Sequence, residues 1–157
     1  MKQQNWKSYA FWILLSVGVG ALAGWLNREG TEIFQQTAVQ PLFSPPSIVF
    51  PIVWGILYTL MGLSAARIYM ADPSFHRSWG LNLFIAQLVV NFFWSIFFFN
   101  LQAYGFSFLW ILLLWGLILL MILSFRQVDP LAAWLQIPYL LWVTFAAYLN
   151  YGVWRLN

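Results

Sequence analysis

The sequence contains no cysteine and very few charged residues. Without cysteine the chain has no disulfide, no thiolate nucleophile and no thiolate metal site. Lys, Arg, Asp and Glu make up 7% of the 157 residues, whereas about 25% is usual in a soluble domain. With one histidine and four scattered acidic residues, we predict no metal site and no bound cofactor. So few charges cannot solvate the surface of a globular protein, and we predict an integral membrane protein.

Apolar and aromatic residues dominate the chain. Hydrophobic residues account for 62% of it and aromatic residues for 21%, with eleven tryptophans. The apolar residues form five runs long enough to cross a bilayer as helices. The runs cover roughly residues 8–26, 46–68, 79–100, 105–125 and 131–154. We therefore predict an all-α integral membrane protein, a five-transmembrane-helix bundle in a single domain over 1–157, with a long loop at 27–45.

The charges that are present predict the topology. Lys2 and Lys7 precede the first run as in a signal peptide, but no small-residue cleavage site follows Trp25, so we expect a retained span. An odd number of spans places the termini on opposite sides. With the N-terminus inside, five cations lie in cytoplasmic segments, against Arg28 and Arg155 outside. The five are Lys2, Lys7, Arg67, Arg77 and Arg126. This bias predicts a multi-pass protein of the cell membrane with a cytoplasmic N-terminus and an outer C-terminus.

No nucleic-acid partner is expected, because the basic residues form no cluster with interleaved aromatics. His76 is the only histidine, and we predict it to be a solvated loop residue beside Arg77. Within the long loop we predict a short helix over about 31–39. In the first run Gly20 and Gly24 fit the small-xxx-small pattern of close helix approach. They are a candidate homodimer face, and so is the third run.

The start of the second run carries a pair of large aromatic residues. Ser44 can cap a helix that starts at the proline pair 45–46, since proline is tolerated in the first turn. Trp54 and Tyr58 are four residues apart and therefore share one helical face. They belong either to an interfacial aromatic belt or to the wall of a pocket.

The third run contains a polar stripe, because Gln87, Asn91 and Ser95 recur at intervals of four residues beside Trp94. An amide at bilayer depth must find a partner. The stripe either forms interhelical hydrogen bonds or lines a pocket. We favour the hydrogen bond for Gln87 and the pocket for Asn91.

The last two runs differ in character. The fourth is almost wholly Leu, Ile, Trp and Phe, and we assign it to the scaffold. The fifth contains Pro138, which should kink it. A stripe of aromatic, small and amide residues follows in steps of three and four: Tyr139, Trp142, Ala146 and Asn150.

Several ordered motifs together resemble the TspO/MBR family, which comprises bacterial tryptophan-rich sensory proteins and the mitochondrial translocator protein (peripheral benzodiazepine receptor). Pro45-Pro46 followed by Phe50-Pro51-Ile-Val-Trp54-Gly-Ile-Leu-Tyr58 looks like its second-helix signature. Asn91-Phe-Phe-Trp94 resembles its third-helix pattern, with Phe92 in place of a tryptophan. Three further segments resemble its fifth helix: Asp129-Pro-Leu-Ala-Ala133, Pro138-Tyr139-Leu-Leu-Trp142 and Leu149-Asn150-Tyr151-Gly-Val-Trp154-Arg155.

The resemblance implies a five-helix bundle, often dimeric, that binds porphyrin, haem and synthetic isoquinoline-carboxamide or benzodiazepine-like ligands. The implied ligand-binding residues are Trp54, Tyr58, Asn91, Trp94, Tyr139, Trp142 and Ala146. Trp54 and Trp142 match positions implicated in light-driven porphyrin breakdown. Leu149, Tyr151 and Arg155 fit a weak sterol-binding pattern.

The sequence departs from the family before the proline pair. The usual Lys-Pro-x-Trp is here Gln40-Pro41-Leu42-Phe43. The loop thereby loses a cation and an indole, which predicts weaker capture of tetrapyrrole propionates.

Three functions remain open at this point. The first is a membrane receptor or sensor that binds tetrapyrroles. The second is a slow, light- and oxygen-dependent porphyrin-degrading enzyme in which Trp54 and Trp142 donate electrons. The third is a porphyrin or sterol transporter. Coupled transport is disfavoured, because ion coupling usually leaves an ionisable residue within the membrane. We expect all four acidic residues in loops: Glu29, Glu32, Asp72 and Asp129.

Overall fold

The computed structural model describes residues 2–157, with side chains from residue 5 onward. It confirms the all-α class: residues 2–157 form helices and no strand, and five helical segments are long and apolar enough to cross a membrane. The elements are α1 (Lys2–Leu26), α2 (Arg28–Thr37), α3 (Val49–Tyr69), α4 (Phe75–Ser95), the π-helical turn η1 (Ile96–Asn100), α5 (Tyr104–Arg126), α6 (Pro130–Leu135) and α7 (Ile137–Leu156).

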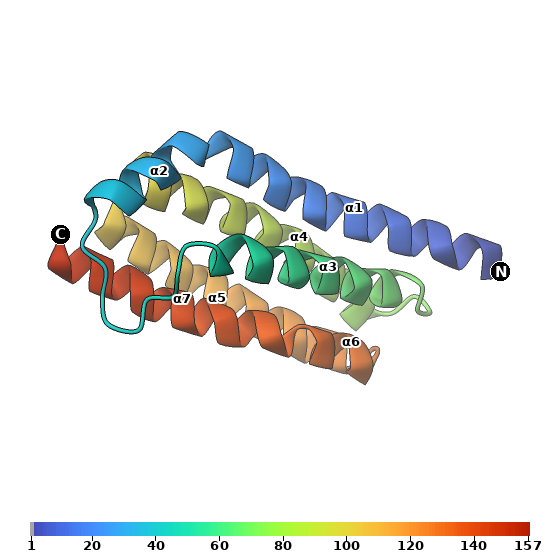
Figure 1. Cartoon of the computed structure of the whole chain (residues 1–157). Coiled ribbons are helices and arrows are strands. Elements are labelled where there is room, and N and C mark those ends of the chain that lie inside the picture. Colours follow the sequence, from blue (N-terminus) through green and yellow to red (C-terminus); the bar gives the residue numbers. More distant parts are fainter. Residues whose placement is uncertain (1) are drawn as a thin grey trace.

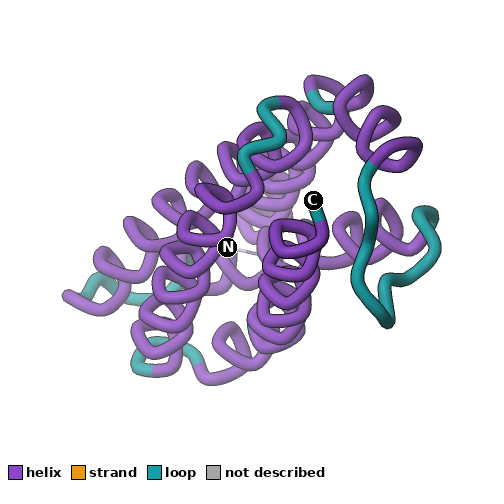
Figure 2. The backbone as a smooth tube through the Cα atoms, turned by 90° about the vertical axis from the view of Figure 1, so that its left-hand side faces the viewer, coloured by secondary structure: helices purple, strands orange, loops and turns teal. Residues whose placement is uncertain are grey.

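The long helices run lengthwise through one bundle, and the two termini lie at opposite ends of it (Figure 1). The most extensive packing joins α1 to α3, α4 to α5 and α5 to α7. The short helix α2 and the connection that follows it lie at the end of the bundle that holds the C-terminus (Figure 1). Figure 2 looks approximately along the helices and shows this connection as a long non-helical segment at the rim.

Three of the spans begin at other residues than predicted, and the first of them, α1, begins at Lys2 rather than at residue 8. α3 begins at Val49 rather than at the proline pair, and the Ser44 hydroxyl donates to the Pro41 carbonyl at 2.7 Å instead of capping a helix. α4 begins at Phe75, four residues earlier than predicted, because Ser74 caps it by accepting a hydrogen bond from the Arg77 N–H at 3.1 Å.

The earlier start of α4 corrects the prediction for His76. This residue lies in the first turn of α4 rather than in a loop, although its side chain is exposed to solvent as expected. In the same way the predicted short helix is present as α2, but it begins at Arg28. Glu29 and Glu32 therefore lie on a helix and not in a loop.

The last span is broken, as Pro138 predicted. α6 ends at Leu135 and α7 begins at Ile137, because proline has no N–H to donate and its ring collides with the carbonyl four residues earlier. Asp129 caps α6 through the Leu131 N–H at 3.1 Å. Its other oxygen lies 2.7 Å from Nε of Arg67, so an ion pair joins α3 to α6 at this end.

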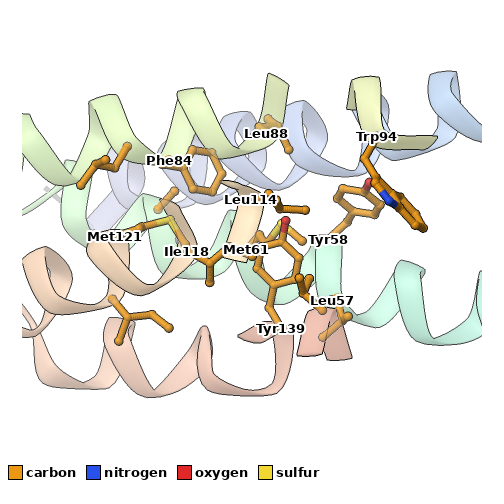
Figure 3. Packing of buried hydrophobic residues seen from close by; sticks show 14 of the residues in the cluster. Leu57, Tyr58, Met61, Phe84, Leu88, Trp94, Leu114, Ile118, Met121 and Tyr139 are labelled. Carbon is orange, nitrogen blue, oxygen red and sulfur yellow. The ribbon is translucent and has the colours of Figure 1, made fainter. Parts of the chain in front are cut away.

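The hydrophobic core fills the half of the bundle nearer the N-terminus. Nine apolar side chains of α3, α4 and α5 are fully buried, at 0% exposure: Met61, Ala65, Ala66, Ile68, Phe84, Leu114, Ile118, Met121 and Phe125. Figure 3 labels five of them, Met61, Phe84, Leu114, Ile118 and Met121. α5 serves as scaffold, as predicted, but it also buries two serines. The hydroxyls of Ser107 and Ser124 donate to the carbonyls of Ala103 and His76. Serine can remain inside an apolar helix when its hydroxyl finds a carbonyl acceptor.

Glycines allow two close contacts with α1. A Cβ on Gly62 would lie 2.7 Å from the backbone nitrogen of Ile13, so only glycine lets α1 and α3 approach this closely. A Cβ on Gly20 would lie 2.5 Å from the Tyr58 ring, whereas one on Gly24 would meet nothing within 4 Å. Gly20 therefore contacts α3 within the chain and Gly24 does not, and the dimer face stays a prediction.

Candidate ligand-binding site

A cavity of about 620 Å³ occupies the half of the bundle that the core leaves open. Its walls come from α1, α2, α3, the end of α4 with η1, and α7, and the connection between α2 and α3 covers it. Eight large aromatic residues contribute to the lining: Phe34, Phe50, Trp54, Tyr58, Trp94, Phe98, Phe99 and Trp142.

Trp54 and Trp142 meet across this cavity from α3 and α7. Their ring centroids are 6.4 Å apart with the planes at 89°, and Tyr58 lies 5.5 Å from Trp54. Edge-to-face pairs of this kind hold each ring in a fixed orientation. Nε1 of Trp142 is buried and has no hydrogen-bond partner. The two indoles therefore present both aromatic surface and one unused donor.

A hydrogen-bonded chain of three side chains joins α4 to α7. Nδ2 of Asn91 donates to the Tyr139 hydroxyl at 2.8 Å, and that hydroxyl donates to Oε1 of Gln87 at 2.7 Å. Gln87 thus makes the interhelical bond that we favoured for it. Asn91 makes such a bond and also lines the cavity. Tyr139 is 1% exposed and is not among the lining residues. Its ring points into the bundle (Figure 3), and its hydroxyl fixes the amide of Asn91 by accepting a hydrogen bond from it.

A second hydrogen-bonded chain fixes the indole of Trp94. Its Nε1 donates to Oδ1 of Asn150 at 2.9 Å, and Nδ2 of Asn150 donates to the Tyr104 carbonyl at 2.9 Å. Both Trp94 and Asn150 line the cavity. Because the bonds connect α4, α7 and the start of α5, the ring is held from three elements.

The π-helical turn η1 shapes the end of the cavity near α2. It places Phe98 and Phe99 in the lining, and Phe34 of α2 lies 5.1 Å from the Phe98 ring. A Cβ on Gly30 would lie 2.6 Å from the Phe99 carbonyl oxygen, so α2 sits directly on this turn. Asn100 donates to the Leu26 carbonyl at 3.2 Å at the end of α1. Such π-turns frequently occur at functional sites.

The connection that covers the cavity is attached to the C-terminal half of α7. The Asn157 side chain accepts from the Val39 N–H at 3.0 Å and donates to the Val39 carbonyl at 2.8 Å. The Tyr148 hydroxyl donates to the Leu42 carbonyl at 2.8 Å. These bonds hold the connection against α7, beside an interior that is mostly apolar.

Comparison with known proteins identifies the family. The sequence profile of the TspO/MBR family matches residues 12–155. The chain belongs to the TspO/MBR family. It is 36% identical to "Tryptophan-rich protein TspO" of Chlorobaculum tepidum over 149 residues, 94% of each chain. It is 38% identical to "Protein CrtK" of Rhodobacter capsulatus over 75% of this chain and 74% of that one. It is 36% identical to the "Translocator protein" of Homo sapiens over 91% of this chain and 86% of that one.

The departure from the TspO/MBR pattern before the proline pair lies at the cavity cover. Gln40, at the position where the family usually has lysine, is among the lining residues. Phe43, which replaces the indole, is 84% exposed. Arg28 is then the one charged side chain in the described lining, and its Cζ lies 4.6 Å from the centre of the Trp25 ring.

The three residues of the sterol pattern do not share one surface. Leu149 is buried in the cavity wall, whereas Tyr151 is 45% exposed and packs against Phe108. Side chains two positions apart on an α-helix point in directions about 200° apart around its axis, so Leu149 and Tyr151 face opposite sides. Arg155 is exposed in the last turn of α7.

Six of the seven residues predicted to bind ligand line the cavity, and Tyr139 supports it from behind. The aromatic residues that sequence reasoning missed come from α2, the first turn of α3 and η1, namely Phe34, Phe50, Phe98 and Phe99. It also missed Asn27, a buried amide directly after the first apolar run. Its position in the sequence could have indicated a site residue, since a polar side chain at the end of a span needs a partner.

Proposed function

We propose that this TspO/MBR protein is a membrane receptor or sensor that binds a flat tetrapyrrole, porphyrin or haem, in the cavity. The wall of aromatic faces around Trp54 and Trp142 carries the proposal. A cavity of about 620 Å³ lies within the range of roughly 300–1,000 Å³ that is typical of small-molecule sites. The sensor role is supported by the relative named "Tryptophan-rich sensory protein" from Cereibacter sphaeroides, 34% identical over 75% of this chain.

The same cavity suits synthetic isoquinoline-carboxamide and benzodiazepine-like ligands. These molecules combine fused aromatic rings with an amide. Fixed amides such as Asn91 and the unused donor of Trp142 offer partners for that group. Binding of both ligand classes to one site predicts that they compete with each other.

Titration with protoporphyrin IX in the dark tests the proposal. Purified protein in detergent should show saturable quenching of tryptophan fluorescence. Trp142→Phe and Asn91→Ala should each weaken binding by about tenfold, equivalent to about 1.4 kcal/mol, because each removes one wall contact. Trp134→Phe is the matched control, since Trp134 is 70% exposed and lies outside the lining. Absence of saturable binding to the wild type would contradict the tetrapyrrole proposal.

A second candidate is slow, light-driven porphyrin degradation. It is favoured by the contact of two oxidisable indoles with each other and with one cavity. Excited porphyrin would accept one electron from an indole, and molecular oxygen would take that electron from the porphyrin radical anion to form superoxide. The indole radical cation would then recover an electron from the ground-state porphyrin, and the resulting porphyrin radical cation would combine with superoxide, so that the macrocycle gains one molecule of oxygen and the indole is restored. Trp54 and Trp142 are the donors in this proposal, and no other catalytic group is required.

Illumination of the double variant Trp54→Phe, Trp142→Phe with bound protoporphyrin IX and oxygen tests that chemistry. Light-dependent loss of the porphyrin absorption band should disappear at ligand concentrations that still saturate the site. The double variant Trp79→Phe, Trp134→Phe controls for general photo-oxidation, because both of these indoles are largely exposed outside the cavity. Unchanged product formation in the first variant would remove Trp54 and Trp142 from the mechanism.

We also propose that the chain lies in the cell membrane with its N-terminus in the cytoplasm. The cavity cover then faces outward, so ligands would reach the site from that side. Porphyrin or sterol transport is a weaker candidate, since Arg28 is the single charge in the described lining and offers no proton-coupling group.

A further inference from the structure

Asn27 is a buried amide in the cavity wall at the junction of α1 and α2. It is 2% exposed and occupies the N-cap position of α2. An asparagine at this position normally uses Oδ1 to accept a hydrogen bond from the first turn of its helix. Here the side chain makes no such bond. Helix capping therefore does not explain why an amide is buried at this place.

The hydroxyl of Ser95 determines the orientation of the Asn27 amide. Ser95 has one proton, and that proton is donated to the Phe92 carbonyl at 2.7 Å. The serine oxygen can then only accept from its neighbour, and Nδ2 of Asn27 donates to it at 2.8 Å. The amide nitrogen thus faces α4, and a flipped amide would place two acceptors together.

This orientation leaves Oδ1 of Asn27 without a hydrogen-bond partner. The backbone of the residue is satisfied, since its N–H donates to the Ala23 carbonyl at 3.0 Å and its carbonyl accepts from the Thr31 N–H at 2.8 Å. A buried acceptor without a partner destabilises a protein by about 1–3 kcal/mol. Because Asn27 lines the cavity, a ligand bound there can supply the missing donor.

We propose that Oδ1 of Asn27 accepts a hydrogen bond from a neutral O–H or N–H group at the polar end of the ligand. The adjacent Arg28 disfavours a cationic donor, because no acidic side chain is among the described residues of the lining to balance it. Asn27 and Arg28 together then select a ligand end that carries one neutral donor and one anion.

This assignment rests on the proposed tetrapyrrole binding and specifies which chemical form is bound. A porphyrin with two propionic acid groups fits the pair. One group remains ionised and lies near Arg28. The other, removed from water beside Asn27, keeps its proton, because burial disfavours the charged form of a carboxyl group. The protonated carboxyl then donates its O–H to Oδ1.

Two ligands that differ only at these groups test the assignment. Protoporphyrin IX and its dimethyl ester are titrated into wild type, Asn27→Leu and Arg28→Gln, at low and at high salt. Asn27→Leu removes the acceptor and keeps the number and branching of the side-chain heavy atoms. It should weaken binding of the free acid by about tenfold and leave binding of the ester, which has no O–H, within about twofold. Asn27→Ala removes the same acceptor without a branched side chain and replaces Asn27→Leu if that variant does not fold.

The salt concentration distinguishes the contribution of Asn27 to binding from that of Arg28. The loss caused by Asn27→Leu should persist at high salt because its partner is neutral, whereas the loss caused by Arg28→Gln should shrink through screening. Equal losses for acid and ester, or no loss for either, would overturn the role of Asn27 and leave tetrapyrrole binding intact. If wild type binds neither porphyrin, the tetrapyrrole proposal fails and this assignment fails with it.

Discussion

The hydroxyl of Tyr139 shows how a single atom organises the site. It accepts from Asn91 and donates to Gln87, so two amides of α4 depend on one side chain of α7. Sequence spacing predicted Tyr139 as a contact residue for the ligand. Its burial instead makes it a support that positions Asn91, whose amide does line the cavity.

Tyr139→Phe should therefore reduce stability. The variant keeps the ring but leaves Nδ2 of Asn91 and Oε1 of Gln87 without their shared partner. We expect a loss of about 1–2 kcal/mol, within the range for buried and intramembrane hydrogen bonds. Thermal unfolding in detergent measures it. Tyr151→Phe is the matched control, because the Tyr151 side chain is 45% exposed. Equal melting temperatures for the two variants would refute the supporting role.

At the scale of elements, the contact of α1 with α3 is the most extensive one between two helices. Gly62 brings the helices together, while further along α1 Gly20 accommodates the Tyr58 ring. Toward the C-terminal end of α1 the cavity lies between the helices, and Gly24 meets no neighbour. Small residues thus close one part of this helix pair, and aromatic residues line the part that stays open.

Gly62→Ala should disrupt this helix pair. The added methyl group would lie 2.7 Å from the backbone oxygen of Trp12, and a backbone cannot move aside as a flexible side chain can. Overpacking of this kind usually costs about 1–3 kcal/mol. Gly55→Ala on the same helix is the control, since its Cβ would meet nothing within 4 Å and alanine favours the helix by up to about 1 kcal/mol. The melting temperatures of the two variants in detergent test this expectation. Equal destabilisation would contradict the close-packing explanation.

The whole molecule combines a packed half and a hollow half. The packed half holds the ion pair of Arg67 with Asp129 and the fully buried core. The hollow half holds the cavity, its cover and α2. The termini lie at opposite ends (Figure 1), so the packed end and the cavity end face different sides of the membrane.

The absence of cysteine makes the proposed orientation directly measurable. Two single-cysteine variants, Asn5→Cys and Gln36→Cys, place a thiol at exposed positions. Asn5 lies near the start of α1, and Gln36 lies near the end of α2. A membrane-impermeant maleimide should label position 36 in intact cells and position 5 only after permeabilisation. The unchanged chain controls for background, since it has no thiol. Labelling of position 5 alone in intact cells would reverse the orientation.

The sequence alone determined the class of protein and the number of spans. Five apolar runs with almost no charge can only be stable as helices in lipid, because each backbone amide there must bond within its own segment. The break near Pro138 followed from the missing N–H of proline. Six of the residues that line the cavity were also predictable, from the spacing of aromatic and amide side chains and from the family resemblance.

Only the tertiary structure decided which residues stand behind the cavity wall and what α2 and η1 add to it. A local pattern specifies the face of a helix but not the helix that meets it. Tyr139 and Trp142 differ by three positions on one helix, and their different roles depend on neighbours from α4 and α3. The unpaired oxygen of Asn27 likewise arises only because α4 places Ser95 within reach of its nitrogen, across 68 positions of sequence.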